Sequence, residues 1–364
     1  MVLKEQNVLI LERTMGIGGS SQVVLQICKA LQPHVNKIVV CSSGGAHTEK
    51  LKKMNMKHVT IPDICDKRAF LTISKILKKI VCEEKITIIH SHHRMAAFYV
   101  EVLGLYSNRF FLHTAHGEFF DKRFLTRYAL RHAKIVACGE CVKSNLKTVY
   151  KLPNDQVDVV KNAVEPTERD CLYDEQIQKH RKEGKFIVAN IGRLSWEKGF
   201  DYYVSAIPYV ISKHPNSMFL VVGTGKDENK LIELVQKLKI SEYVHFLGYR
   251  SDAREIMTQV DLIVLSSLTE GLPLTPIEAF CAGKTIVATD VGGTSEVVQH
   301  NINGILVKAK DEVALAEAIN WLIDDQDKRK KLEKAARQTF LDDYNMDKFF
   351  REYILCYEKL IKRG

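Results

Sequence analysis

The stretch that decides the fold is DLIVLSSLTEGLPLTPIEAF, Asp261–Phe280. Its first half, DLIVLSS, has the apolar and β-branched character of a buried strand, and an apolar helical pattern begins at Ile277. Strand, turn and helix in this order are typical of an open α/β sheet, in which ligands bind beyond the carboxyl ends of the strands. Glu270 then falls in the turn and Glu278 in the helix, so we expect both carboxylates to face that crevice.

Two fixed carboxylates at the end of a sheet suit the recognition of hydroxyl groups. Glu270 and Glu278 are separated by seven residues, and carboxylate oxygens accept hydrogen bonds from vicinal hydroxyls such as those of a sugar or a ribose. The alternative is that one glutamate only stabilises the helix N-terminus and the other is solvated. The motif GRLSWEKG, found earlier in the chain, favours the first interpretation.

GRLSWEKG, Gly192–Gly199, follows the apolar strand predicted at Phe186–Ile191. Arg193 and Lys198 would project from a glycine-bounded loop at a strand end. A guanidinium fork and a compact ammonium bind phosphate oxygens in complementary ways, so this pair is a candidate diphosphate site. The alternative is a pair of ordinary surface cations.

Near the N-terminus, a strand at Val8–Leu11 leads into MGIGGSSQVVLQICKAL, Met15–Leu31. Gly18 and Gly19 precede an amphipathic helix, where glycine permits close backbone approach and the helix N-terminus favours an anion. The turn is neither G-x-G-x-x-G nor a P-loop. By itself it could be an ordinary strand-to-helix connection.

Taken together, the motifs of this chain resemble those of the retaining GT-B glycosyltransferases of family 4. The matching pieces occur in the family's order and span nearly the whole chain. They are the GIGG turn, HTAHGE (His113–Glu118), KNAV (Lys161–Val164), GRLSWEKG, VVGTGK (Val221–Lys226), VHFLGYR (Val244–Arg250) and TEGLPLTPIEAFCAGK (Thr269–Lys284).

The resemblance implies an α/β protein of GT-B architecture, with two Rossmann-like domains facing across a cleft. Residues 1–164, with a C-terminal helix over 347–364, would form the acceptor domain, and residues 165–346 the nucleotide-sugar donor domain. It further implies transfer of a sugar from a nucleotide-sugar, most often a UDP-sugar, with retention of anomeric configuration. No cofactor and no metal would be needed.

The resemblance also implies the site residues. Glu278 would bind the ribose and Glu270 the transferred sugar, while His116 contacts that sugar and Arg193 and Lys198 neutralise the diphosphate. The catalytic set is therefore Glu270, Arg193, Lys198 and His116. The donor-binding set is Gly18, Gly19, Arg193, Lys198, Tyr249, Arg250, Glu270, Gly271, Leu272, Leu274, Thr275 and Glu278. The acceptor-binding set is Ser20, His92, Arg94, Glu118 and Asn162.

Length and composition agree with two α/β domains. The chain has 364 residues and is 46% hydrophobic, which is enough for two cores. Strand and helix patterns alternate, as expected for parallel sheets covered by helices. The first series of strands runs from Val8 to Ala137, and the second is predicted to begin near Val157–Val160. The polar segment Glu165–Gly184 is a plausible linker.

The excess of positive charge belongs to the first domain. Residues 1–165 hold 25 Lys and Arg against 14 Asp and Glu, a net charge of +11, and the remainder holds 28 against 30, a net charge of −2. The segments Lys67–Ile80 and Phe119–Lys134 combine basic with aromatic and aliphatic residues at helical spacing, which could place them on an anionic membrane. The alternative is a core-facing stripe with a solvated basic back. No pattern indicates nucleic-acid binding.

Other patterns point to the cytoplasm and away from metal chemistry. No apolar run is long enough for a membrane span and the N-terminus lacks a signal-peptide pattern, so we expect a cytoplasmic protein, peripheral on the inner face of the plasma membrane. Cys138 and Cys141 form a lone C-x-x-C and are expected to serve in packing. The only Asp-x-Asp, Asp325–Asp327, is expected to be a solvated turn.

Three functional hypotheses follow. The favoured one is a retaining glycosyltransferase that builds a surface polysaccharide, glycolipid or glycoconjugate on a glycan or lipid-linked acceptor. A second is a GT-B phosphorylase or epimerase, which would need a pyridoxal lysine or a different set of histidine and carboxylate residues. A third is a non-catalytic nucleotide-sugar-binding partner of another transferase.

Overall fold

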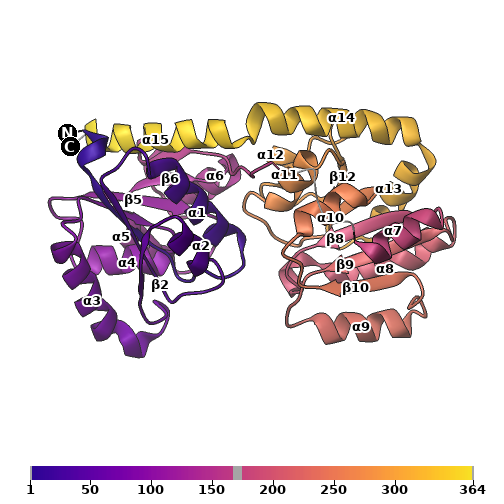
Figure 1. The fold of residues 1–364 in the computed structure, drawn as a ribbon, viewed down its shortest axis with the longest axis horizontal. Coiled ribbons are helices and arrows are strands. Elements are labelled where there is room, and N and C mark those ends of the chain that lie inside the picture. Colours follow the sequence, from indigo (N-terminus) through magenta and orange to yellow (C-terminus); the bar gives the residue numbers. More distant parts are fainter. Residues whose placement is uncertain (1, 167–173, 363–364) are drawn as a thin grey trace. The chain divides into compact units, whose positions relative to one another are not determined.

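A computed structural model describes residues 2–166 and 174–362 of the chain. The chain forms two compact units (Figure 1). The first comprises Met1–Asn162 together with Met346–Gly364, and the second comprises Ala163–Asn345. The predicted boundaries, after residues 164 and 346, lie within two residues of these bounds.

The N-terminal unit contains a parallel sheet of seven strands in the order β3-β2-β1-β4-β5-β6-β7. Its central strands are buried and largely apolar, as expected for parallel strands covered on both faces. The order reverses between β1 and β4, which is the topological switch point of the sheet. The strands are β1 (Asn7–Leu11), β2 (Lys37–Ser42), β3 (Lys57–Thr60), β4 (Ile88–Ser91), β5 (Phe110–Ala115), β6 (Lys134–Ala137) and β7 (Val157–Val159).

Helices cover both faces of this sheet (Figure 1). They are α1 (Gly19–Leu31), α2 (Thr48–Lys53), α3 (Phe70–Glu83), α4 (Arg94–Val102), α5 (Arg123–Leu130), α6 (Glu140–Thr148) and α15 (Met346–Lys362), with 3₁₀ turns η1 (Leu3–Glu5), η2 (Lys67–Ala69) and η3 (Asn154–Gln156). The C-terminal helix α15 packs against α1 and β5, so the last residues of the chain return to the first unit. Tyr353 and Tyr357 of α15 are fully buried there.

The C-terminal unit repeats the same plan with six parallel strands in the order β10-β9-β8-β11-β12-β13. Its switch point lies between β8 and β11. The strands are β8 (Phe186–Ile191), β9 (Ser217–Val222), β10 (Val244–Gly248), β11 (Leu262–Leu265), β12 (Ile286–Thr289) and β13 (Ile305–Val307). The helices are α7 (Glu175–Lys182), α8 (Phe200–Ile211), α9 (Glu228–Lys237), α10 (Ala253–Gln259), α11 (Leu274–Cys281), α12 (Thr294–Val297), α13 (Glu312–Asp324) and α14 (Gln326–Asp343), with the 3₁₀ turn η4 (Trp196–Lys198).

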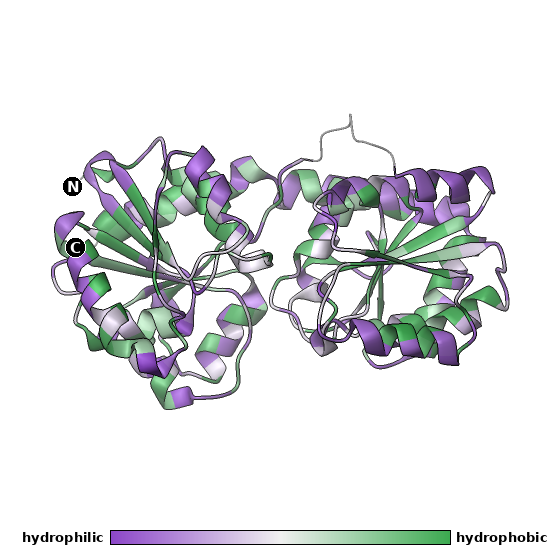
Figure 2. Cartoon of the chain, turned by 60° about the horizontal axis from the view of Figure 1, so that its bottom comes forward, coloured by the Kyte–Doolittle hydropathy of each residue, from purple (hydrophilic) through white to green (hydrophobic). Residues whose placement is uncertain are grey.

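Hydropathy separates the layers in both units. Figure 2 shows hydrophobic strands inside each unit and helices that are hydrophilic on their outer faces. The core of the second unit joins β8 and β9 to α8 and α13 through fully buried residues such as Tyr203, Phe219 and Ile319. Each sheet therefore supplies a rigid platform whose carboxyl edge carries the loops that hold the predicted site residues.

Three assignments made from the sequence need correction. The strand at Val157–Val159 pairs with β6 and so completes the first sheet, whereas the sequence pattern assigned it to the second series. The polar segment predicted as a linker contains helix α7, which Asp174 caps by accepting hydrogen bonds from the amides of Gln176 and Ile177; residues 167–173 of that segment lie outside the described residues. The short strand β13 was not predicted, because three residues give too little pattern.

None of the helices within residues 2–166 and 174–362 is long and apolar enough to cross a bilayer.

Candidate functional site

The central feature of the C-terminal unit is an ion pair at its switch point. Lys198 follows β8 and Glu270 follows β11, and these two strands are neighbours in the sheet. The Lys198 Nζ lies 2.6 Å from Glu270 Oε1. Ser267 also donates its hydroxyl hydrogen to Glu270 Oε1, over 2.6 Å. The predicted phosphate-binding and sugar-binding groups therefore meet at the edge where open α/β sheets bind ligands.

Close backbone contacts fix the loop that carries Lys198. Gly199 has φ +58°, and a Cβ there would lie 2.1 Å from the carbonyl oxygen of Ser266. The Ser266 hydroxyl donates to the Lys198 carbonyl and accepts from Asn190 Nδ2. Only glycine at position 199 allows the β8 and β11 loops to approach this closely.

The second carboxylate, Glu278, lies on α11 near the same groups. It is the fifth residue of α11 and is half-buried, as the sequence pattern predicted for a helix position after the turn. Burial raises the pKa of Glu278, and the nearby cations Arg254 and Lys198 partly oppose that rise. The charge of Lys198 thus acts on both carboxylates, and a carboxylate pair with one shared cation is suited to accepting hydrogen bonds from hydroxyl groups.

The two predicted arginines are each engaged within the protein. Arg193 Nη2 lies 2.6 Å from Glu197 Oε1, and the Arg193 side chain is 67% exposed. Arg250 forms a fork with both carboxylate oxygens of Asp252 and also pairs with Asp174. Arg193 is itself exposed and can turn toward a ligand by leaving the half-buried Glu197, whereas Arg250 is held by two carboxylates and is better placed to fix its loop.

The remaining donor-binding candidates lie around the start of α11 and the end of β10. Leu274 and Thr275 form the first turn of α11, where backbone N–H groups without helical acceptors favour an anionic ligand. Gly271 accepts a backbone hydrogen bond from Gly293, which ties the turn to the loop after β12. Leu272 is buried, and Tyr249 is half-exposed at the end of β10.

In the N-terminal unit, three polar side chains gather at the other switch point. Glu12, His92 and His116 each follow directly on a strand, β1, β4 and β5 in turn, and these strands are neighbours in the sheet. One potential ligand atom from each of the three lies within 4.8 Å of the others. The Nδ1 of His92 and the Nε2 of His116 are 3.0 Å apart and share a hydrogen bond.

A network of buried histidines surrounds this cluster. His90 bonds to Tyr357 through Nδ1 and to Thr114 through Nε2, at 2.7 and 2.8 Å, and His113 Nδ1 bonds to Ser91. Burial lowers the pKa of His113 to about 3 and that of His116 to about 4. These imidazoles are therefore neutral at pH 7. His113 is a structural histidine, whereas His116 is half-buried and can meet a ligand.

The glycine turn of the N-terminal unit leads into α1 as predicted. Gly18 is the N-cap residue and Gly19 begins the helix, and a Cβ at Gly18 would meet no atom within 4 Å. Ser20 is half-buried in the first turn, and Ser21 is buried with its hydroxyl on the carbonyl of Thr14. The open space at Gly18 is what an approaching ligand would need.

The acceptor-binding candidates have different surroundings. Arg94 pairs with Asp121 at 2.8 Å and stacks over the Phe119 ring, so it links α4 to the segment before α5. Glu118 is half-buried, two residues after His116. Asn162 is buried at the end of the first unit. His92 belongs to the cluster with Glu12 and His116.

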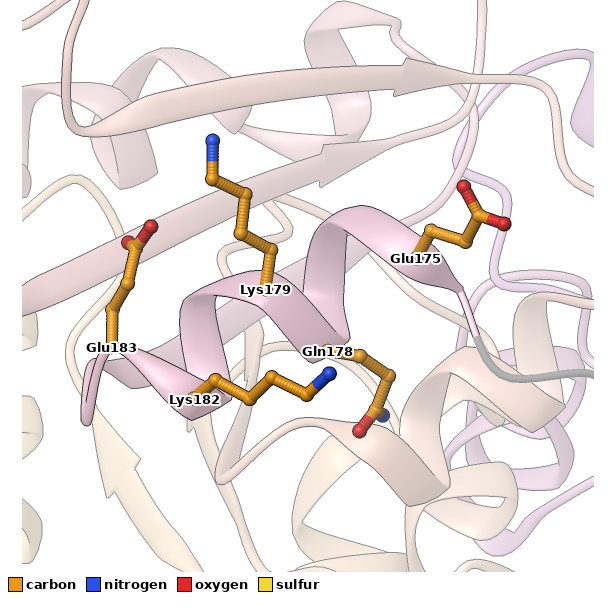
Figure 3. Close-up of a pocket in the computed structure, with 5 residues that line it drawn as sticks. All are labelled: Glu175, Gln178, Lys179, Lys182 and Glu183. Atoms are coloured by element: carbon orange, nitrogen blue, oxygen red, sulfur yellow. The ribbon is translucent and has the colours of Figure 1, made fainter.

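A surface hollow beside α7 lacks the strand-end side chains that make up the two sites above. Its lining comes from one helix and the residue after it, and Figure 3 shows Lys182 alongside Gln178 while Lys179 points to the other side. The lining residues are Glu175, Gln178, Lys179, Lys182 and Glu183. No strand end contributes a side chain, so we do not assign it a function.

Sequence reasoning missed Glu12, Ser267 and Arg254. Glu12 is a single carboxylate directly after the buried strand β1, and that position alone was the available signal. The contact of Ser267 with Glu270 depends on the turn geometry, which the sequence does not specify. The Asp-x-Asp predicted as a solvated turn is exposed but begins a helix: Asp325 caps α14 by accepting from the amide of Lys328, and Asp327 lies in its first turn.

Family comparisons cover most of the chain. The model for "Glycosyl transferases group 1" matches residues 173–339, and the model for "Glycosyltransferase Family 4" matches residues 17–168. The first match contains the Lys198 and Glu270 pair, and the second contains His92 and His116.

Two curated relatives and one solved structure illustrate the similarity. An E. coli protein, UDP-Gal:alpha-D-GlcNAc-diphosphoundecaprenol alpha-1,3-galactosyltransferase, is 25% identical over 79% of this chain and 80% of its own. The N,N'-diacetylbacillosaminyl-diphospho-undecaprenol alpha-1,3-N-acetylgalactosaminyltransferase of Campylobacter jejuni is 36% identical over 49% of this chain. A glycosyltransferase structure from Rickettsia africae superposes with a TM-score of 0.85 at 24% identity, covering 99% of this chain and all of that one. This chain covers less than two thirds of the length of several curated relatives: 46% of the Campylobacter protein, and 60% and 62% of two archaeal proteins.

Proposed function

Because this chain belongs to the glycosyl transferases of group 1 and family 4, we propose that it transfers a sugar from a UDP-sugar to a hydroxyl group of a lipid-linked or other glycan acceptor. The anomeric configuration of the sugar is retained. The product would belong to a surface polysaccharide or glycolipid. The donor assignment is supported by the E. coli relative, whose name specifies UDP-Gal as its donor.

The observation that carries the proposal is the contact of Lys198 with Glu270, over 2.6 Å, at the switch point of the C-terminal sheet. When a diphosphate binds, its oxygens compete with Glu270 for the ammonium group of Lys198. Glu270 is then available to accept hydrogen bonds from the sugar, while Glu278 accepts from the ribose. Binding of the donor thus replaces a protein ion pair with contacts to both ends of the ligand.

In the proposed reaction, the bond between the anomeric carbon and the phosphate oxygen breaks while the acceptor oxygen bonds to the same carbon. The departing phosphate takes the proton of the acceptor hydroxyl. Negative charge grows on that phosphate in the transition state, so Lys198 and Arg193 catalyse as well as bind. His116 contacts the transferred sugar, and its neutral imidazole can exchange hydrogen bonds with a hydroxyl. No metal is required.

We further propose that the acceptor is reached at an anionic membrane surface. Helices α3 and α5 both contact α4, through Phe70 against Tyr99 and through Phe98 against Tyr128. They expose large apolar side chains, Leu71 at 72% and Phe124 at 93%. Exposed cations accompany these side chains, namely Lys75, Lys78, Lys79, Lys122, Arg123 and Arg127. Such a surface suits the headgroups around a lipid-linked acceptor.

A donor screen tests the proposal. Nucleotide release is measured with UDP-Gal, UDP-Glc, UDP-GalNAc, UDP-GlcNAc and GDP-mannose, using diphospho-lipid acceptors, and each reaction is run with and without EDTA. We expect release from one UDP-sugar that depends on acceptor, and a product whose anomeric configuration by NMR equals that of the donor. Release only with GDP-mannose would overturn the UDP-sugar donor. Inversion of configuration would overturn retention, and loss of activity in EDTA would overturn the independence from metal. A Lys198→Met variant, which retains the stem without the charge, is the control for contaminating activity.

A further inference from the structure

We propose that Glu12, His92 and His116 form a binding site for one divalent transition cation, with Zn²⁺ as the preferred ion. Two imidazole nitrogens and one carboxylate oxygen are a donor set typical of Zn²⁺ and Fe²⁺, and unlike the all-oxygen sets that Mg²⁺ and Ca²⁺ prefer. The cation takes no part in the proposed transfer reaction, which requires no metal, but the site shares His116 with the residues assigned to that reaction.

Geometry is the first support. The three residues occupy equivalent positions, one after each of three neighbouring strands, so the sheet itself sets their spacing. Their potential ligand atoms lie within 4.8 Å of one another. In a tetrahedral Zn²⁺ site with ligand bonds of about 2.0–2.1 Å, two ligand atoms are separated by about 3.3 Å. The 3.0 Å between His92 Nδ1 and His116 Nε2 is close to that separation.

An unpartnered polar atom is the second, independent support. Glu12 is 3% exposed. Its Oε2 is buried without a hydrogen-bond partner among the residues that the structure describes. The other carboxylate oxygen, Oε1, accepts from the amide of Arg13, which holds the side chain in place. A buried polar atom without a partner costs about 1–3 kcal/mol, so a bound cation would relieve an existing penalty.

The surroundings allow the ion to enter and hold the ligands. His116 is half-buried and offers the open side of the site. The guanidinium of Arg13, the residue after Glu12, pairs with Asp63 at 2.9 Å. Asp63 therefore offsets a positive charge that would otherwise repel a bound cation. Three protein ligands leave room for a fourth ligand from solvent or substrate.

Occupancy has a consequence that rests on the proposed function. If His116 contacts the transferred sugar, a cation bound to its ring nitrogen withdraws that contact. Zn²⁺ should therefore inhibit transfer, and the inhibition should weaken as the donor concentration rises. Direct binding and inhibition are measured separately, so failure of one is distinguishable from failure of the other.

The experiment uses the full, tag-free chain after treatment with a chelator. Zn²⁺ binding is measured by competition with a chromophoric chelator, and Co²⁺ binding by its visible absorption. We expect one equivalent of each ion to bind, no binding of Mg²⁺ at the same concentration, and a rise in melting temperature with Zn²⁺. Glu12→Gln and His92→Gln should each weaken Zn²⁺ binding by at least about tenfold. His58→Gln, which removes an imidazole on β3 that bonds to Ser42 in the same unit, should bind Zn²⁺ as the parent does.

Circular dichroism and melting without metal establish that each variant folds, and His92→Gln serves if Glu12→Gln does not. Absence of stoichiometric Zn²⁺ binding to the parent overturns the site and indicates that water occupies the space between these residues. Binding that survives both substitutions places the ion elsewhere and also overturns it. Zn²⁺ binding at this cluster without any inhibition would retain the site and remove the sugar contact assigned to His116.

Discussion

At the scale of single residues, the C-terminal site is a set of charges that satisfy one another. Lys198 is paired with Glu270, and Arg193 with Glu197. Each pair is close to solvent on at least one side, since the Lys198 side chain is 25% exposed and that of Arg193 is 67% exposed. A partly exposed pair is weak enough to be exchanged for a ligand. These pairings let the site remain folded without a bound diphosphate.

Removal of either cation should slow the transfer reaction. We expect Arg193→Ala and Lys198→Ala each to lower turnover by at least about tenfold, equivalent to about 1.4 kcal/mol of lost transition-state stabilisation. Arg193→Lys should recover only part of the activity, because the guanidinium fork is lost. Steady-state kinetics, with melting curves to verify folding, provide the measurement. Unchanged kinetics in both alanine variants would remove the diphosphate assignment.

The two glutamates should separate binding from turnover. Glu278→Ala is expected chiefly to weaken nucleotide affinity, because Glu278 is assigned to the ribose. Glu270→Ala is expected chiefly to lower turnover, because Glu270 is assigned to the reacting sugar and also holds Lys198. Calorimetry with UDP and with the UDP-sugar compares the two variants. If Glu270→Ala loses affinity for UDP and Glu278→Ala does not, the two roles must be exchanged.

Gly199 should tolerate no side chain. Gly199 and Gly283 both have a positive φ, +58° and +73°. Of these two positions, Gly199 is the one at which a Cβ would strike a backbone atom. Both alanine variants lose about 1 kcal/mol to the unfavourable φ, so the additional loss in Gly199→Ala reports the contact with Ser266. We expect Gly199→Ala to have the lower melting temperature and the lower affinity for UDP. Equal melting temperatures would show that the β8 and β11 loops can separate.

At the scale of elements, helices α4 and α5 are tied by one buried carboxylate. The Glu101 side chain is fully buried at the end of α4. It accepts hydrogen bonds from Arg131, one residue beyond α5, and from His132 Nδ1 at 3.0 Å. Because α5 also carries the exposed Phe124, this tie positions the surface proposed to meet the membrane.

Loss of the Glu101 charge should loosen both helices. Glu101→Gln is expected to lower the free energy of local opening of α4 and α5 by about 1–2 kcal/mol, the contribution of hydrogen bonds from two half-exposed partners to a buried charged group. Amide hydrogen exchange measures this locally, which suits a chain of two units that need not unfold together. Glu83→Gln, which breaks an exposed pair with Lys79 at 3.8 Å, is the matched control and should have no measurable effect. Equal protection in both variants would contradict the tie.

At the scale of the whole molecule, the two units share a fold plan and differ in charge. The first 165 residues, which form most of the first unit, carry +11, and the remainder, which includes α15 of the first unit, carries −2. A doubly wound sheet does not require this asymmetry. We propose that the positive charge serves an anionic membrane surface around the acceptor, whereas the anionic donor is met locally by Lys198 and Arg193.

The N-terminal unit should bind anionic vesicles. Binding to vesicles that contain phosphatidylglycerol should weaken between low salt and about 0.5 M salt, where the Debye length is roughly 4 Å. Replacement of Lys78, Lys79, Lys122 and Arg123 with Glu should abolish co-sedimentation and spare transfer to a soluble acceptor. A matched variant of the second unit, with Glu at exposed Lys213, Lys230, Lys237 and Lys239, should still bind. Failure of the parent to bind at low salt would contradict the membrane proposal, and equal binding to neutral vesicles would assign it to the exposed phenylalanines.

The sequence by itself determined where the buried strands lie and where the loops that follow them begin. Runs such as FIVANI and DLIVLSS are largely apolar, as strands buried on both faces require, and they coincide with β8 (Phe186–Ile191) and contain β11 (Leu262–Leu265). The glycines of GRLSWEKG and VVGTGK marked the loops, because a side chain at Gly199 or Gly223 would overlap a backbone oxygen. These properties are local in sequence, so a pattern could predict them.

Only the tertiary structure decided which charges meet. Lys198 and Glu270 are separated by 72 positions, and Glu12 and His116 by still more, and each set is brought together by the strand order at a switch point. Strand order depends on how the whole set of helices packs on a sheet, as with β7, whose place in the first sheet no local pattern indicated. The pairing of Arg94 with Asp121 likewise follows from packing, whereas Arg193 pairs locally with Glu197. Chemistry was therefore predictable residue by residue, whereas the pairing of the charges depended on long-range topology.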